Sequence, residues 1–295
     1  MFEGFTEEYR EGAGINLFVR HAGNPKSPAV LLLHGYPQTS AMWRDVAPLL
    51  ARQFHAICPD LRGYGRSDKP SSDGDHSPYS KRAMAEDFIS LMQGFGHERY
   101  FIAGHDRGGR VAHRLGMDHP QSPIAMSLID IAPTREMYAN STAEFARAYW
   151  HWFFLIQNHP LPETLIEAAA EEFWLLKCLR LAGADHPFSD EALSEYLTAF
   201  QDPAVIHATC EDYRAAVGID IQHDDADGDR KLAMPIQLIW AANGVIGKCF
   251  EPLRIWKLRA EYVEGLAVDG THYLVEEHPE FTARQLTQFF QSHIS

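Results

Sequence analysis

Short apolar runs alternate with segments of helical periodicity at both ends of the chain. Six runs predict buried strands: residues 29–33, 56–58, 101–103, 124–129, 236–240 and 266–268. Three segments predict helices: from Ser80, an expected N-cap, to Phe95, from about Gly108 to His119, and from about Pro279 to the C-terminal end. Continuous apolar strands separated by helices predict an α/β fold with a mostly parallel sheet and helices on both faces.

The alternation stops between residues 134 and 230, where the sequence is helical and rich in aromatic side chains, as in YWHWFF at 149–154. An all-helical segment inserted between strands predicts a cap over their carboxyl ends, where open α/β sheets bind ligands. We therefore predict a core domain formed by residues 1–133 and 231–295, and a helical cap (lid) domain formed by residues 134–230.

The charge balance narrows the range of partners. The 295 residues include 26 Lys and Arg against 40 Asp and Glu, a net charge of −14 with His neutral. This field repels phosphate backbones and anionic membranes, so we expect neither nucleic acid nor membrane as a partner. The first residues lack the basic region of a signal peptide and no apolar run reaches membrane-spanning length, so we expect a cytoplasmic protein. An anionic substrate would require a local positive cluster.

Metal and disulfide signatures are weak in this sequence. The four cysteines lie far apart without a CxxC pair, so we expect free thiols: Cys58, Cys178, Cys210 and Cys249. The 16 His form no HExxH or comparable helical spacing, so we expect no metal and no organic cofactor. The acidic stretch 224–230 departs from a calcium loop, because Arg230 stands where glycine is required, and it predicts a solvated turn at the cap-to-core junction.

The most specific motif is GHDRGGR at residues 104–110, between a predicted strand and a predicted helix. It has the G-x-S-x-G pattern of a nucleophile elbow with Asp106 in the serine position. An acid, Asp130, follows the next strand, and His272 follows the last one. Nucleophile, acid, histidine is the chain order of α/β-hydrolases. Asn243 occupies the alternative acid position, so Asp130 is the better third member.

A carboxylate nucleophile restricts the substrate. Attack on an ester would give a reactive anhydride, whereas displacement at an sp³ carbon gives an ordinary ester that water can cleave. Asp106 therefore indicates carbon–halogen or epoxide substrates, with His272 as the base that activates water and Asp130 as its partner. The backbone N–H groups of Tyr36, which follows another strand, and Arg107 are expected to form the oxyanion hole.

Two arginines, Arg107 and Arg110, lie three residues apart at the start of the predicted helix. Cations oppose the helix dipole there, at a cost of about 0.3–1 kcal/mol each when exposed. We interpret them as a clamp on a substrate carboxylate that aligns its α-carbon with Asp106. A structural role, in pairing with acids of the cap, is the alternative.

Several segments together resemble the fluoroacetate (haloacetate) dehalogenases of the α/β-hydrolase superfamily: HGYPQ at 34–38, DLRGYGRSDKP at 60–70, GHDRGGR at 104–110 and HW at 151–152. The resemblance extends over nearly the whole chain. It implies hydrolysis of small 2-haloacids to hydroxyacid and halide, an α/β-hydrolase fold and a homodimer. It also implies a role for each matching residue: Asp106 as nucleophile, His272 as base, Asp130 as its partner, Arg107 and Arg110 as the carboxylate clamp, and His151, Trp152 and Tyr213 as the halide pocket.

Two other functions remain open. An epoxide hydrolase would use the same aspartate and cap tyrosines that protonate the opening oxygen, for which there are four candidates: Tyr138, Tyr149, Tyr196 and Tyr213. Its neutral substrate would not need Arg107 and Arg110, and epoxide hydrolases usually carry Trp at the position of Arg107. A binding protein on a hydrolase scaffold is the remote alternative, since all three members of the expected triad are present.

Overall fold

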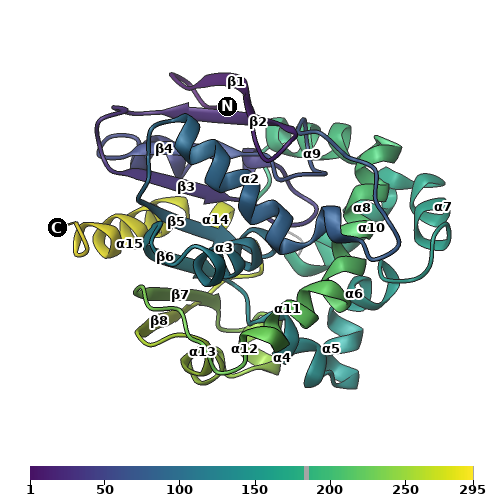
Figure 1. The fold of residues 1–295 in the computed structure, drawn as a ribbon. Coiled ribbons are helices and arrows are strands. Elements are labelled where there is room, and N and C mark those ends of the chain that lie inside the picture. Colours follow the sequence, from purple (N-terminus) through teal and green to yellow (C-terminus); the bar gives the residue numbers. More distant parts are fainter. Residues whose placement is uncertain (183–185, 295) are drawn as a thin grey trace.

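The computed structural model describes residues 1–182 and 186–294. Within these ranges eight strands form one sheet in the order β1-β2-β4-β3-β5-β6-β7-β8 (Figure 1). Their bounds are β1 Thr6–Glu11, β2 Asn16–Ala22, β3 Ala29–Leu33, β4 His55–Pro59, β5 Tyr100–His105, β6 Pro123–Ile129, β7 Ile236–Ala241 and β8 Val263–Val268. Neighbouring strands from β4 through β8 pair in parallel, which confirms the predicted sheet.

The antiparallel edge formed by β1 and β2 was not predicted. Thr6 pairs with His21 and Glu11 with Asn16, and β2 then pairs antiparallel with β4. β1 contains no buried residue, so it lacks the apolar run that revealed the inner strands. By contrast, all five residues of β3 are buried, which is why its apolar run predicted it well.

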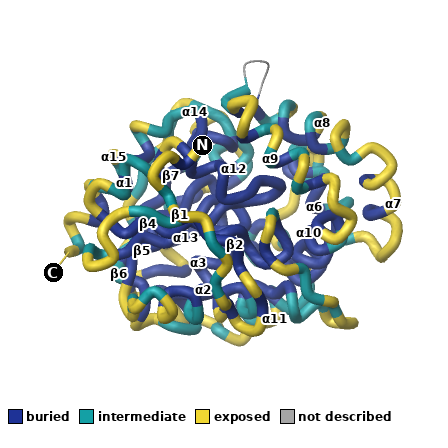
Figure 2. The backbone as a smooth tube through the Cα atoms, turned by 90° about the horizontal axis from the view of Figure 1, so that it is seen from above, coloured by how far each residue is buried: buried dark blue, intermediate teal, exposed yellow. Residues whose placement is uncertain are grey.

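Helices cover both faces of the sheet. Figure 2 shows α2 and α3 on one side of the buried strands and α1, α14 and α15 on the other. Ser80 caps α2 as predicted, because its side chain accepts a hydrogen bond from the N–H of Ala83. The helices and 3₁₀ turns outside the inserted segment are η1 Ser40–Trp43, α1 Ala47–Leu50, η2 Ser77–Tyr79, α2 Lys81–Gly94, α3 Arg107–Asp118, α12 Val245–Cys249, α13 Pro252–Arg259, α14 Leu274–Glu277 and α15 Pro279–Gln291.

The chain between β6 and β7 contains helices and no strand in its described residues. Figure 1 shows most of these helices gathered beside the sheet, at the edge where β5 ends. Their bounds are α4 Thr134–Ala139, α5 Ala143–Ala148, α6 Trp150–Phe154, α7 Leu161–Glu167, α8 Ala170–Ala182, α9 Asp190–Phe200, α10 Pro203–Val217 and α11 Ile219–Asp227. The division into a core and a cap domain stays a prediction.

The acidic stretch 224–230 is only partly the solvated turn that its composition predicted. Asp224 and Asp227 belong to α11 and are buried or partly buried against α3. There Arg114 lies 2.7 Å from Asp227 and 3.7 Å from Asp224. The prediction was wrong for these residues because a buried guanidinium on α3 requires carboxylates beside it.

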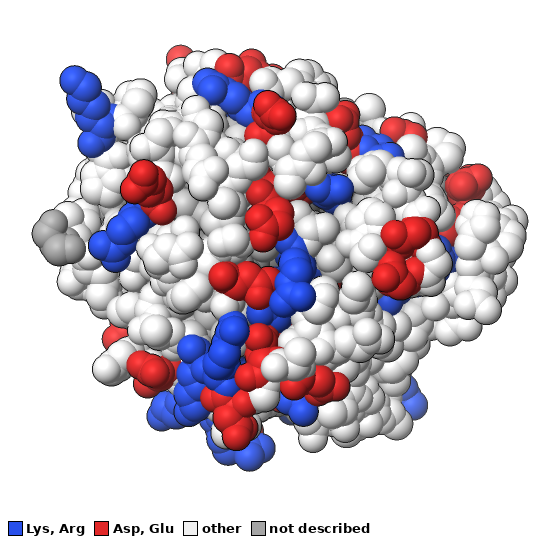
Figure 3. All heavy atoms as spheres, viewed as in Figure 1, with Lys and Arg blue, Asp and Glu red and all other residues white. Residues whose placement is uncertain are grey.

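The four cysteines are free, and three of them are buried, as predicted. None of the described helices combines the length and the apolar character needed to cross a bilayer. On the face drawn in Figure 3, acidic side chains lie beside most of the basic ones.

Candidate active site

Asp106 lies in the turn between β5 and α3. Its backbone has φ 46° and ψ −114°, a conformation that side-chain-bearing residues rarely adopt. The turn is crowded, because a Cβ on Gly104 would lie 2.7 Å from the carbonyl carbon of Gly108, and a Cβ on Gly108 would lie 2.5 Å from the carbonyl oxygen of His34. Glycines at both positions therefore allow the tight turn that places the Asp106 carboxylate at the carboxyl edge of the sheet.

The turns after β6 and β8 bring Asp130 and His272 to the same edge. Asp130, at φ 49°, accepts a hydrogen bond from the N–H of Ala241 at 3.0 Å through Oδ1. Its Oδ2 lies 2.7 Å from Nδ1 of His272. Nε2 of His272 is 3.9 Å from Oδ2 of Asp106. A carboxylate at Nδ1 favours the tautomer with its proton there, which leaves Nε2 unprotonated and facing Asp106.

The site holds Asp106 as a carboxylate. Burial alone would raise its pKa, but the imidazole of His272 and the guanidiniums of Arg110 and Arg107 hold the pKa well below its usual value. His105, adjacent in the chain, is neutral because burial, with His272 nearby, lowers its pKa to about 3. Its Nε2 lies 2.8 Å from the carbonyl oxygen of His272 and so anchors the loop that carries that imidazole.

One of the two expected oxyanion donors is directed at Asp106. The N–H of Tyr36 donates to Oδ1 at 3.1 Å. A Cβ on Gly35 would lie only 2.5 Å from Cβ of Asp106, so glycine permits this approach. The N–H of Arg107 makes no hydrogen bond to another described residue, which leaves it available beside Asp106.

Arg107 is fully buried and is paired with an acid from the inserted helices. Its Nε donates to Oδ2 of Asp212 on α10 at 3.0 Å, and Nη2 contacts Oδ1 of the same carboxylate. Lys81 and the hydroxyl of Tyr64 also bind Asp212. Among the described residues Nη1 of Arg107 has no partner. The pairing of Arg107 with an acid of the inserted helices, which was the structural alternative expected from the sequence, is therefore present. Its Nη1 remains available to a ligand.

Arg110 has no carboxylate partner in the described structure. Its Nη1 donates to the carbonyl of Ala132 at 2.9 Å and to Oγ1 of Thr134 at 2.8 Å, while Nη2 contacts Sδ of Met137 at 3.2 Å. Its buried Nε is unpartnered within the described ranges. Burial, opposed by Asp106, lowers the pKa of Arg110, so this cation is poorly compensated.

The three residues that the resemblance assigns to a halide pocket lie together. The rings of Trp152 and Tyr213 are 6.1 Å apart, and His151 is 6.0 Å from Tyr213. The guanidinium of Arg107 covers the Tyr213 ring at 4.2 Å, and Arg110 covers Trp152 at 4.6 Å. Nε1 of Trp152 and the hydroxyl of Tyr213 are buried and make no hydrogen bond within the described part of the chain. These two donors are therefore available to a bound anion.

Comparison with known proteins places the chain in a family. A family model described as alpha/beta hydrolase fold matches residues 28–216. A fluoroacetate dehalogenase from a Burkholderia species is 41% identical over 292 residues, which cover 98% of this chain and 95% of that protein. The chain belongs to the haloacetate dehalogenase family of the α/β-hydrolase superfamily.

Other relatives of this α/β-hydrolase carry different names. A soluble epoxide hydrolase from a Corynebacterium species is 32% identical over 88% of this chain and 89% of its own. A solved structure from Pseudomonas aeruginosa is a mutant protein provisionally described as an epoxide hydrolase and holding bound MFA. It has a TM-score of 0.91 and 41% identity over 99% of this chain and 97% of its own. The relatives therefore show the family, but they do not agree on a substrate, which has to be inferred from the residues of the site.

Sequence reasoning missed Asp212 and Lys177, which this α/β-hydrolase places beside the site, and considered Tyr149 only as a candidate tyrosine of an epoxide hydrolase. Asp212 fixes Arg107, and the hydroxyl of Tyr149 lies 3.2 Å from Nδ1 of His272. Lys177, buried on α8, donates weakly to the carbonyl of Tyr36 at 3.3 Å. Burial lowers the pKa of Lys177, whose hydrogen bonds in the described structure go to the carbonyl of Tyr36 and the hydroxyl of Tyr273 and not to a carboxylate. No local motif marks any of the three, because each is recognised only by its partner in space.

Proposed function

We propose that this hydrolase removes halide from haloacetates by nucleophilic displacement at the α-carbon. One observation carries the proposal: N–H and O–H donors without a partner among the described residues lie with the guanidiniums of Arg107 and Arg110 near the ionised carboxylate of Asp106. The donors are Nε1 of Trp152, the hydroxyl of Tyr213, Nη1 of Arg107 and Nε of Arg110. A substrate with an anionic carboxylate and a departing halide would satisfy both sets.

In the first step an Asp106 oxygen forms a bond to the α-carbon while the carbon–halogen bond breaks and the halide takes the bonding electrons. Arg107 and Arg110 hold the substrate carboxylate, so the α-carbon faces Asp106. Trp152, Tyr213 and His151 line the position of the departing halide. Fluoride requires these donors most, because it is strongly hydrated in water and the site must replace that hydration.

In the second step water attacks the carboxyl carbon of the Asp106 ester. His272 takes the proton at Nε2, and Asp130 stabilises the imidazolium that forms. The negative charge that develops on the Asp106 oxygen is stabilised by the N–H of Tyr36 and that of Arg107. On collapse the imidazolium of His272 returns its proton to the leaving alkoxide oxygen, which releases the hydroxyacid, and loss of the second water proton to solvent restores the Asp106 carboxylate. The separation of 3.9 Å between Nε2 and Oδ2 suits a base that acts through a water rather than on Asp106 itself.

Epoxide hydrolysis is the second candidate, and one observation favours it. The hydroxyls of Tyr138 and Tyr213 are both buried without a partner in the described structure, so tyrosine O–H groups are available to protonate an opening ring. A neutral epoxide, however, would leave Arg110 without an anion. Burial of an uncompensated guanidinium is costly, which favours the anionic substrate.

The two candidates are separated by one assay. The purified protein is incubated with fluoroacetate, chloroacetate or styrene oxide, with halide read by an ion-selective electrode and diol by chromatography. Halide release from a haloacetate supports the proposal. Diol formation without halide release would replace it by epoxide hydrolysis. The helical cap domain, the homodimer and a cytoplasmic location stay predictions of the sequence and its resemblance.

A further inference from the structure

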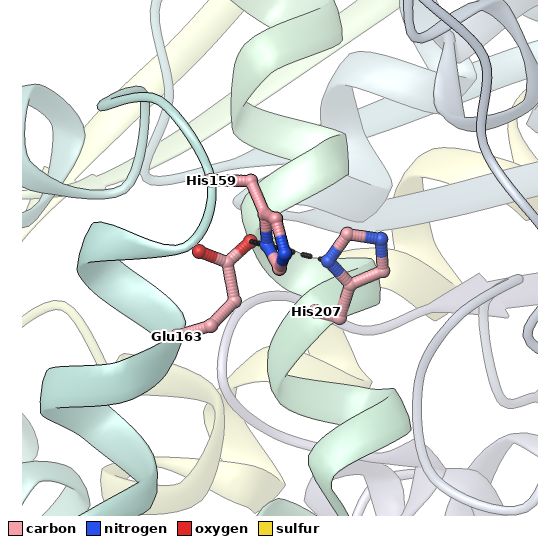
Figure 4. Close-up of side chains that lie close together, drawn as sticks. All are labelled: His159, Glu163 and His207. Carbon is pink, nitrogen blue, oxygen red and sulfur yellow. Dashed lines mark hydrogen bonds and ion pairs between the residues drawn. The ribbon is translucent and has the colours of Figure 1, made fainter.

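A second cluster of polar side chains lies on the inserted helices, among residues with no role in the proposed reaction. Glu163 on α7 is buried, and His159, just before α7, and His207 on α10 lie beside it (Figure 4). Nδ1 of His207 is 3.1 Å and Nδ1 of His159 is 3.3 Å from the same oxygen, Oε1 of Glu163. The His159 side chain is 62% exposed and that of His207 is 40% exposed, so solvent reaches both imidazoles.

Oε1 of Glu163 has more neighbours than its lone pairs can serve. Nη1 of Arg214 donates to it at 2.7 Å, and Nδ1 of His207 makes a hydrogen bond with it. A carboxylate oxygen offers about two lone-pair sites, so these contacts fill it. His159 then lies 3.3 Å away as a third neighbour, in ion-pair contact rather than hydrogen-bond geometry. Nδ1 of His159 therefore lies beside an oxygen to which it makes no hydrogen bond, a position that a shared cation would stabilise.

We propose that His159, His207 and Glu163 form a binding site for a divalent transition-metal ion of the zinc type. The three ligand atoms lie within 4.8 Å of one another. Zinc bonds of about 2.0 Å in a tetrahedron separate neighbouring ligand atoms by about 3.3 Å, close to the two N···O distances observed. The wider separation between the imidazoles can close by rotation of the exposed His159. Two imidazoles and one carboxylate favour zinc over magnesium or calcium, which prefer all-oxygen sites.

The local charge accommodates such an ion. Arg214 bridges two carboxylates, because its Nη1 also contacts Glu211 at 2.7 Å. The pair of glutamates therefore exceeds the single arginine by one negative charge. Nη2 of Arg214 binds Oε2 of Glu163 at 3.1 Å, so the arginine retains one oxygen when a metal takes the other. A cavity of about 280 Å³ borders His159 and Arg214, so water can approach the site from the side of His159.

Metal binding would join α7 to α10 and so stabilise the inserted helices. The same network continues to the loop before α2, where Ser72 and His76 both contact Oε2 of Glu211. A ligand that binds only the folded state raises its stability in proportion to the logarithm of its free concentration. Zinc should therefore raise the melting temperature of the protein when the site is intact.

The experiment titrates zinc chloride into the full chain at neutral pH by calorimetry and records melting curves with and without zinc. The wild type is compared with His159→Ala, whose exposed side chain can be removed without disturbing the fold, and with His207→Ala. The matched control is His119→Ala, because His119 contacts a single carboxylate, Glu86, at 2.7 Å without a second histidine. Magnesium chloride serves as the second probe.

The wild type and the His119 variant should each bind one zinc ion with equal affinity and gain melting temperature. His159→Ala and His207→Ala should bind at least about tenfold more weakly and lose most of that gain. Equal zinc affinity in all four proteins would show adventitious binding and overturn the proposal, as would magnesium binding as tight as zinc binding. Absence of zinc binding by the wild type at millimolar concentration would also overturn it. None of these results depends on halide release.

Discussion

The hydroxyl of Tyr213 has no hydrogen-bond partner among the described residues. Its removal should therefore lower the activity without lowering the stability of the protein. Tyr213→Phe keeps the ring, which packs against Tyr36 with centroids 5.2 Å apart, and deletes only the oxygen. A hydrogen bond to a charged group contributes about 1.5–3 kcal/mol, so loss of this donor to the departing halide should lower kcat/KM roughly 10- to 150-fold. The loss should be greater for fluoroacetate than for chloroacetate, because fluoride requires more hydration to be replaced.

The stability of this variant should not fall. A buried hydroxyl without a protein partner costs free energy in the folded state, so its removal should leave the free energy of unfolding unchanged or raise it by up to about 1 kcal/mol. The matched control is Tyr196→Phe, in an equally buried tyrosine whose hydroxyl donates to Oε1 of Glu276 at 3.0 Å. That variant should lose about 1–2 kcal/mol of stability and keep its activity within about twofold.

Halide-electrode kinetics and urea unfolding on the three proteins test this reasoning. The expected pattern is a less active but stable Tyr213 variant and an active but less stable Tyr196 variant. If Tyr213→Phe is less stable than the wild type and equally active, its hydroxyl has a structural role and the assignment of the halide pocket fails.

Three further predictions follow from the same structure. His272→Ala should accumulate the ester on Asp106, seen as a mass increase of the peptide that contains it; an unmodified peptide despite substrate binding would contradict the covalent mechanism. Arg110→Leu should raise KM for haloacetates by more than about tenfold, because it removes a guanidinium from the carboxylate position, whereas the exposed Asp225→Asn should change KM little; equal small effects would remove the clamp. Burial, with Arg114 opposing it, raises the pKa of Asp224 to about 7. Since the folded state then holds a proton that the unfolded state has released, stability should fall as pH rises from about 4 to 7, and Asp224→Asn should flatten this decline in urea unfolding; an unchanged pH profile would contradict the raised pKa.

Elements that leave a pattern in consecutive residues were predicted accurately, and those that depend on distant partners were not. Residues 29–33 predicted β3 to the residue, because five consecutive buried positions leave a continuous apolar run. β1 was missed because its exposed edge leaves no such run. Asp224 was assigned to a turn from composition alone, although it belongs to α11 and lies near Arg114 on α3.

In the candidate site, too, some features could be read from the local sequence and others could not. The turn around Asp106 could be read locally, since glycines flank the position wherever the backbone is this crowded. The order of Asp106, Asp130 and His272 predicted that the three would meet, because the carboxyl ends of parallel strands lie at one edge of a sheet; the structure places His272 2.7 Å from Asp130. The proposed halide donors came from family resemblance, since no periodicity distinguishes Trp152 from an ordinary core residue.

By itself, the sequence determined the parallel sheet, the tight turn at Asp106 and the chain order of Asp106, Asp130 and His272, all of which can be read along the chain. Only the tertiary structure decided which charges are compensated. It pairs Arg107 with Asp212, 105 positions away, and leaves Arg110 without an acid in the described chain. It also brings His207 to Glu163, 44 positions apart, where helical spacing alone had indicated no metal site. The partner of a buried charge is set by helix packing over long sequence distances, which no local pattern records.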